Sequence, residues 1–153
     1  MRGKTLQILF VLVWCMVLVV GCEPELVTSP ILPGETAVLV ITFSPSPVYE
    51  GYENKYRFTV FIDEVNGVGA RITSIRIEYI NDGGSVFETH TYGQSRVAQD
   101  FFGTSRIEAY GRLMTSVDAL ECYSCARTSW LVQAIDDRDN YVEYSGTVEL
   151  ISR

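Results

Sequence analysis

The chain has 153 residues, with 12 Lys and Arg against 19 Asp and Glu, and a net charge of −7 at neutral pH. This length suits one domain with a hydrophobic core and is short for two. Nucleic-acid binding needs clustered cations, whereas the lysines here are only Lys4 and Lys55 and the arginines are scattered. The composition therefore excludes a nucleic-acid partner and argues against electrostatic attachment to anionic lipid.

The first 21 residues have the pattern of an export signal. Arg2 and Lys4 form a basic start, and the run Ile8–Val20 contains no charged side chain. As a helix this run would cover about 20 Å, less than the roughly 30 Å hydrocarbon core of a bilayer, so a permanent span is disfavoured. We therefore expect residues 1–21 to be a helical signal segment that is cleaved.

The end of this segment, Leu18-Val19-Val20-Gly21-Cys22, resembles the lipobox of bacterial lipoproteins. The resemblance implies cleavage between Gly21 and Cys22, lipid on Cys22, and a membrane as partner through that lipid. Val19 stands where the family most often has leucine. The lipobox resemblance also implies that the protein lies in the bacterial cell envelope, with the domain outside the cytoplasm. The alternatives are an ordinary secretory signal and an uncleaved anchor.

Residues 22–36 are expected to be the lipidated cysteine and a tether. The stretch Glu23–Gly34 contains three prolines, which remove backbone donors and favour extended structure. Fully extended, it would reach on the order of 35 Å from the bilayer.

Residues 37–153 are predicted to form one domain built from short strands. Ala37–Phe43 is a continuous apolar run, typical of a strand buried on both faces. Tyr56–Val65 and Ile72–Ile80 instead alternate, the pattern of a strand with one buried face. The residues expected to face inward are Tyr56, Phe58, Val60 and Ile62 in one strand and Ile75, Ile77 and Tyr79 in the other.

Turn residues predict two hairpins. Asn81-Asp82-Gly83-Gly84 supplies the positive-φ residues of a tight turn, so Ser85–Tyr92 is expected to return beside the preceding strand. Trp130–Asp136 and Tyr141–Ile151 form the second hairpin around an acidic turn.

The region between the hairpins is less regular. Arg106–Leu113 is predicted to be a strand, and Thr115–Arg127 a loop or short helical turn. With about seven strands and no convincing amphipathic helix, the pattern indicates an all-β, antiparallel sandwich. Three runs resemble strands of immunoglobulin-like or fibronectin-III-like modules of bacterial surface proteins, namely Ile72–Tyr79, Arg106–Ala109 and Trp130–Asp137. This resemblance covers about residues 37–151 and implies the fold only.

Cys122 and Cys125 remain once the signal has been removed and Cys22 carries lipid. In an exported protein, such a pair most simply forms a local disulfide. Free thiols and a redox or metal site are the alternatives. Nearby acidic residues oppose the thiolate of a redox pair, and a zinc site would need further ligands from a distance. We therefore predict a disulfide, no metal and no cofactor.

Catalytic motifs are weak throughout the sequence. His90 is the single histidine, and it is expected to point outward from its strand rather than to activate a nucleophile. The turn Asp136–Asn140 clusters oxygen ligands of the kind that calcium takes, but Arg138 would repel a cation and acidic turns commonly end hairpins. No spacing singles out a carboxylate pair for glycosidase chemistry. The expected protein is not an enzyme.

The segment Ser44–Lys55 offers a possible binding loop through Tyr49 and Tyr52. Exposed tyrosines on a rigid sandwich bind proteins and sugars well, although these two could instead cover the end of the core. The expected function is a membrane-anchored envelope lipoprotein whose sandwich is a binding module for a protein or glycan, or a structural module. The alternatives are a loop-presenting inhibitor of an extracellular hydrolase and a small carboxylate-based envelope enzyme.

Overall fold

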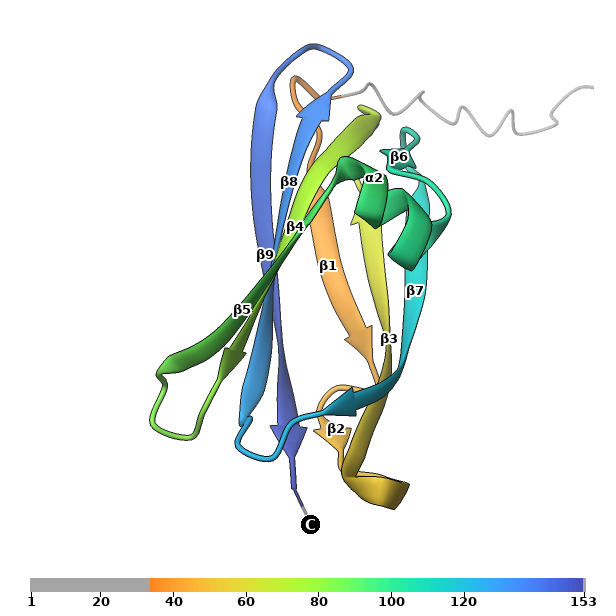
Figure 1. Cartoon of the computed structure of the whole chain (residues 1–153). Helices are drawn as coiled ribbons and strands as arrows, with labels where there is room; N and C mark the ends of the chain where they lie inside the picture. The colour runs from red at the N-terminus through yellow and green to blue at the C-terminus, as the bar shows by residue number, and fades with distance from the viewer. Residues whose placement is uncertain (1–33, 153) are drawn as a thin grey trace, which may run out of the picture. The chain divides into compact units, whose positions relative to one another are not determined.

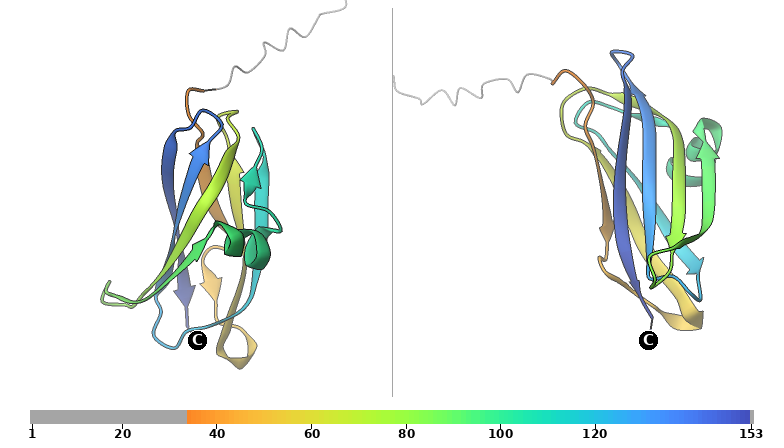
Figure 2. Two further views of the ribbon diagram at one scale, coloured as in Figure 1. Left: turned by 45° about the horizontal axis from the view of Figure 1, so that its top comes forward. Right: turned by 90° about the vertical axis from the view of Figure 1, so that its left-hand side faces the viewer.

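The computed structural model describes residues 34–152, so the predicted signal, Gly21, Cys22 and the tether up to residue 33 lie outside the described residues. Within this range the chain forms two facing β-sheets (Figures 1 and 2). None of the helices described is long and apolar enough to cross a membrane.

The smaller sheet has three antiparallel strands in the order β1-β3-β7. Their bounds are Leu39–Ser44 for β1, Lys55–Glu64 for β3 and Arg112–Glu121 for β7.

The larger sheet runs in the order β2-β9-β8-β4-β5, and the short strand β6 also pairs with β4. All of its pairs are antiparallel except β2 with β9. The strands are β2 (Val48–Tyr49), β4 (Ala70–Ile80), β5 (Val86–Gly93), β6 (Arg106–Ile107), β8 (Arg127–Asp136) and β9 (Tyr141–Ile151).

This strand order is that of an immunoglobulin-like sandwich. The smaller sheet, β1-β3-β7, corresponds to strands A-B-E of that fold. The larger sheet, β9-β8-β4-β5, corresponds to strands G-F-C-C′, and β2 is an extra short strand beside β9. Seven strands have six residues or more and two have only two residues. The predicted all-β sandwich of about seven strands is confirmed.

Three short helical segments complete the fold. Tyr52–Asn54 forms a single turn, η1, before β3. Gln94–Arg96 (α2) and Val97–Phe102 (η2) follow β5 and lie against β4 and β7 at the open side of the sandwich. The helical segment formed by α2 and η2 was not predicted from the sequence. In η2 one side chain, Val97, is fully buried.

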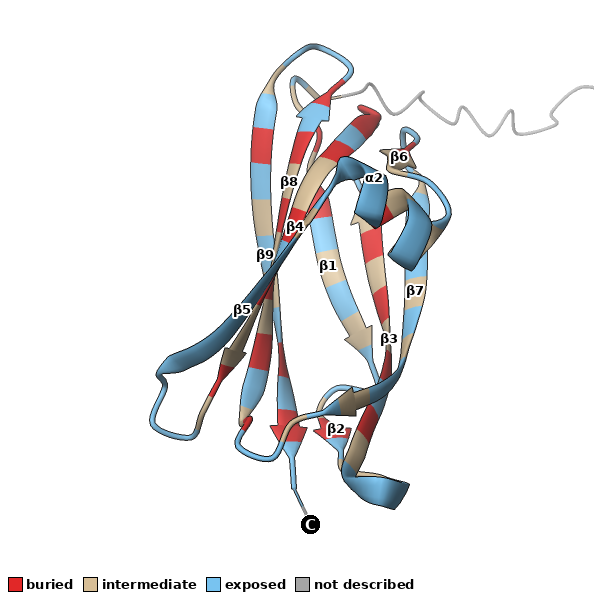
Figure 3. Ribbon diagram, viewed as in Figure 1, coloured by how far each residue is buried: buried red, intermediate tan, exposed pale blue. Residues whose placement is uncertain are grey.

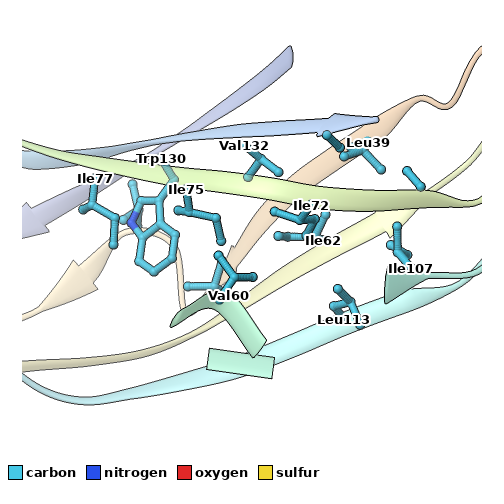
Figure 4. Close-up of a cluster of buried hydrophobic side chains, with 14 of the residues drawn as sticks. Leu39, Val60, Ile62, Ile72, Ile75, Ile77, Ile107, Leu113, Trp130 and Val132 are labelled. Carbon is cyan, nitrogen blue, oxygen red and sulfur yellow. The ribbon is translucent and has the colours of Figure 1, made fainter. Parts of the chain in front are cut away.

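The core comes from the alternation that the sequence displays. In β3, Tyr56, Phe58, Val60 and Ile62 are all buried, as predicted. Figure 4 shows side chains of the two sheets converging, among them Val60 and Ile62 from one side and Ile75, Ile77 and Trp130 from the other. Figure 3 shows the resulting bands of buried and exposed residues along each strand.

The prediction for β1 was wrong. Ala37–Phe43 was expected to be buried on both faces, but β1 is the edge of the smaller sheet and buries only alternate residues. Val40, for example, is exposed, because one face of this three-stranded sheet has no covering layer.

The region Arg106–Arg127 was also misassigned. A turn around Tyr110, whose φ is 56°, separates β6 from β7, and β7 then occupies most of the predicted loop. Within β7 a bulge adds one residue, because Phe58 pairs with Val117 while Tyr56 pairs with Leu120. The two inward residues, Val117 and Leu120, are therefore three positions apart, which is not the period of two that predicts a strand.

Candidate binding site

Glu64 lies at the end of β3 and is buried. Its two carboxylate oxygens accept hydrogen bonds from the backbone N–H groups of Val38, Asn66, Gly67 and Tyr110. Burial raises the pKa of Glu64, but the four hydrogen bonds outweigh it, and the pKa lies below its ordinary value. This carboxylate therefore stays ionised and holds three loop segments together at one end of the sandwich.

Asp136, at the end of β8, is a second buried carboxylate that accepts several hydrogen bonds from loop segments. Its oxygens accept hydrogen bonds from the backbone of Ala37, Arg138 and Asn140 and from the Asn140 side chain. Burial acts to raise the pKa of Asp136, and the hydrogen bonds, that of the Asn140 side chain first, bring it below its ordinary value.

These contacts account for the acidic turn between β8 and β9. Both oxygens of Asp136 are engaged, and Asp137 pairs with Arg106, whose Nη2 lies 2.8 Å from Asp137 Oδ2. In residues 34–152, no group of three or more His, Cys, Asp or Glu side chains is arranged to hold a metal ion. The turn is a hairpin closed by a buried carboxylate.

His90, which was predicted to point outward, is an exposed residue of β5. It pairs across the sheet with the buried Ile77, so it lies on the inner face of β5, beyond the part that the smaller sheet covers. Its Nε2 is 2.8 Å from Glu88 Oε1, and its ring contacts those of Tyr79 and Tyr92. The imidazole is thus exposed, with one acidic partner and contacts to two tyrosine rings.

Exposed tyrosines gather at the end of the sandwich opposite the buried carboxylates. Tyr49 in β2 and Tyr52 in η1 are 60% and 80% exposed, so they do not cover the core. Tyr123 is 85% exposed and belongs to the turn between β7 and β8, and Figure 1 shows this turn at the same end as β2. We call these three residues the tyrosine tip. Sequence reasoning missed Tyr123, although its position between two cysteines marked it as part of a turn.

The turn that carries Tyr123 is closed by Cys122 and Cys125. Their sulfur atoms are placed as a disulfide and their Cα atoms are 5.6 Å apart, which supports the predicted pairing. Cys125 is buried at the edge of the core, so the cross-link fixes the turn to the sandwich.

Between the sheets lies an apolar cavity of about 140 Å³. Its wall is aromatic in large part, because Trp130, Phe101 and Tyr92 contact one another in sequence, with ring centroids 5.9 and 4.8 Å apart. Burial first, and then neighbouring Tyr92 and Glu88, raise the pKa of Tyr79 to about 12. The lining residues are Phe58, Ile77, Tyr79, Tyr92, Phe101, Val117, Leu120, Thr128 and Trp130.

Two polar atoms of this lining have no partner. Thr128 Oγ1 and Trp130 Nε1 are buried and make no hydrogen bond with any of the residues described. Both side chains lie on the inward face of β8 and are at most 2% exposed. Buried polar groups are nearly always paired in proteins, so these two mark the cavity as chemically distinct from the rest of the core.

Comparison with known proteins identifies no family and no curated sequence that matches the chain. Among solved structures, the putative ApaA protein from Bordetella pertussis aligns with a TM-score of 0.51 at 10% identity, over 79% of this chain and 98% of that one. The CARDB domain of the PF1109 protein from Pyrococcus furiosus, solved with di-metal ions, gives 0.47 at 15% identity, over 80% and 93%. Murine CRIg gives 0.46 at 12% identity, over 76% and 98%. At these identities the likeness concerns the fold alone.

Proposed function

We propose that this protein is a non-enzymatic, lipid-anchored module of the bacterial cell envelope that binds an envelope protein or glycan through the tyrosine tip. The observation that carries the proposal is the exposure of Tyr49, Tyr52 and Tyr123 at one end of the sandwich, while the described chain begins at the other. A tether attached at Gly34 would direct that end away from the membrane.

Tyrosine suits such a surface for a physical reason. It supplies a large, rigid contact area at low cost in side-chain entropy, together with a hydroxyl that pairs with amide or sugar groups. The tip is held by regular structure on both sides, since β2 pairs with β9 and the Tyr123 turn is cross-linked. Little ordering is then needed when a partner binds.

The described residues also support a role without catalysis. Glu64 and Asp136 are occupied by backbone hydrogen bonds, and His90 is engaged by Glu88 and two tyrosine rings. Glu64 and Asp136 are the buried carboxylates of residues 34–152, and both already have structural partners.

The tip is tested with isolated peptidoglycan sacculi and with envelope membranes as two separate probes. The protein carries Cys22→Ala in these assays, so that lipid does not hold it on the membranes. Co-sedimentation with either probe should then fall at least about tenfold when all three tip tyrosines are changed to alanine, as expected for loss of a binding hot spot. Tyr141→Ala is the matched control, because Tyr141 is also 60% exposed but begins β9 at the opposite end. Equal binding of the triple variant and the control would refute the proposal.

A second candidate is an inhibitor of an extracellular hydrolase. It is favoured by the Tyr123 turn, which is short and cross-linked and presents a tyrosine that is 85% exposed, as an inhibitory loop must present its contact residue. Inhibition of a panel of secreted proteases and glycosidases by the wild type, and its loss in Tyr123→Ala, would select this candidate over the first.

A further inference from the structure

We propose that the cavity between the sheets binds a compact apolar molecule, of the size of one aromatic ring, that carries a hydrogen-bond acceptor oxygen such as a carbonyl. The site is distinct from the tyrosine tip and does not depend on the function proposed above.

The size of the ligand follows from the space. The cavity is about 140 Å³, and a dry protein cavity of about 150 Å³ accommodates benzene. The walls facing this space are carbon-rich, with Phe58, Val117 and Leu120 from the smaller sheet and Ile77 from the larger. A charged or strongly hydrated molecule would lose its solvation there without compensation.

The acceptor oxygen follows from the unpaired atoms. The indole Nε1 of Trp130 can only donate a hydrogen bond, and the hydroxyl of Thr128 can donate or accept one. Both are buried without a partner. They belong to residues two apart on β8, whose side chains share one face. A carbonyl oxygen has two lone pairs, so an oxygen brought between the two atoms by a small movement of the lining side chains would accept from both.

A water molecule satisfies such atoms less well. Buried waters are held by about three hydrogen bonds in a polar site, whereas these two atoms lie in a wall otherwise built mainly of apolar side chains. A small organic molecule would pair with the same two atoms and also fill the apolar volume.

Phe101, on η2, forms one wall of the cavity, because its ring contacts those of both Tyr92 and Trp130. The segment that carries it is anchored on the sandwich by the fully buried Val97. The space is partly open to solvent, so a small molecule can enter without displacing this segment.

The test uses the full chain carrying Trp14→Phe, which leaves Trp130 as the single tryptophan. Acetophenone and α-methylstyrene are the probes, since they differ only in C=O against C=CH₂. Titration is followed by the Trp130 fluorescence and by its single indole N–H resonance. Acetophenone should shift both signals saturably, and should bind about tenfold more tightly than α-methylstyrene, as expected for one hydrogen bond gained.

Two variants separate the cavity from adventitious binding. Val117→Phe fills the space and should abolish saturable binding, with Leu120→Phe as the substitute if that variant does not fold. The double variant Trp130→Phe, Thr128→Val keeps the apolar wall but removes both donors, so binding followed by calorimetry should persist without preference for acetophenone. The proposal is overturned if neither probe saturates, if filling the cavity changes nothing, or if the wild type binds the two probes equally.

Discussion

Glu64 and Asp136 end strands in different sheets, yet their carboxylates accept hydrogen bonds from the adjacent backbone amides of Val38 and Ala37. The N-terminal segment of the domain is thereby attached to both sheets at once. Asp136 also orders the β8–β9 turn of its own sheet, whereas Glu64 orders the β3–β4 and β6–β7 connections between the two sheets. One end of the sandwich therefore depends on two buried charges.

Glu64→Gln should therefore destabilise the fold. The amide cannot accept four backbone hydrogen bonds as the carboxylate does, and one of its ends carries donors that would face N–H groups. We expect a loss of about 2 to 3 kcal/mol in the free energy of unfolding, measured in urea at pH 7. Glu88→Gln, on the exposed strand β5, is the control and should change stability by less than about 0.5 kcal/mol.

The same two residues predict acid sensitivity. Because the pKa values of Glu64 and Asp136 are lowered in the folded state, their contribution is complete above the unfolded values of about 4.3 and 3.9, and is lost as the pH falls through the lowered folded values. The wild type should lose stability steadily below about pH 4. The double variant Glu64→Gln, Asp136→Asn should show a weaker dependence, and parallel curves for the two proteins would contradict this account.

Thr128→Val should be neutral or stabilising, by up to about 1 kcal/mol, because it replaces an unpaired buried hydroxyl with a methyl group of similar shape. Thermal unfolding of the ligand-free protein measures the change. Thr42→Val on the exposed face of β1 serves as the comparison. A marked loss of stability in Thr128→Val would mean that the hydroxyl has a partner.

Removing the disulfide should loosen the tip but leave the sandwich folded. The cross-link closes a loop of only four residues, so Cys122→Ser with Cys125→Ser is expected to cost about 2 kcal/mol. Hydrogen exchange should rise in the turn around Tyr123 and remain unchanged in β3 and β8. Unfolding of the whole domain in the double variant would show that the bond does more than pin this turn.

Cys22→Ala tests the anchor. In a bacterium the wild type should lose residues 1–21, gain the mass of acyl chains and partition into detergent, because two or more chains hold a protein stably on a membrane. The variant should do none of these. Identical masses and partitioning for the two proteins would contradict the lipoprotein assignment.

The strands with strict alternation could be predicted from the sequence. β3, β8 and β9 carry inward residues at a period of two, and their turns contain the residues that such geometry requires. Strand β7 could not be predicted from the sequence, since its bulge places the inward residues Val117 and Leu120 three positions apart and its exposed face is polar. The sequence also could not show that β1 is buried on one face only, because a run of apolar residues does not reveal whether a second layer covers its other face.

Of the two candidate sites, the tyrosine tip could be predicted in part from the sequence and the cavity could not. Tyr49 and Tyr52 were predicted as a possible binding loop because proline and glycine bound the segment, and Tyr123 could have been added from its place in the cysteine turn. The cavity is different, since its lining comes from β3, β4, β5, β7, β8 and η2. Only the three-dimensional pairing of these elements brings Thr128 and Trp130 to one apolar space.

The position of β1 determines how the domain responds to tension. Its six residues pair with β3 along their whole length, and the first described residue, Gly34, precedes this strand by five positions. A pull on the N-terminal end of β1 acts along the strand axis, at right angles to the hydrogen bonds of an antiparallel pair. The bonds are then loaded together in shear instead of opening one after another. If the proposed anchor holds the N-terminal end, traction on the domain is carried by the whole β1–β3 pair at once.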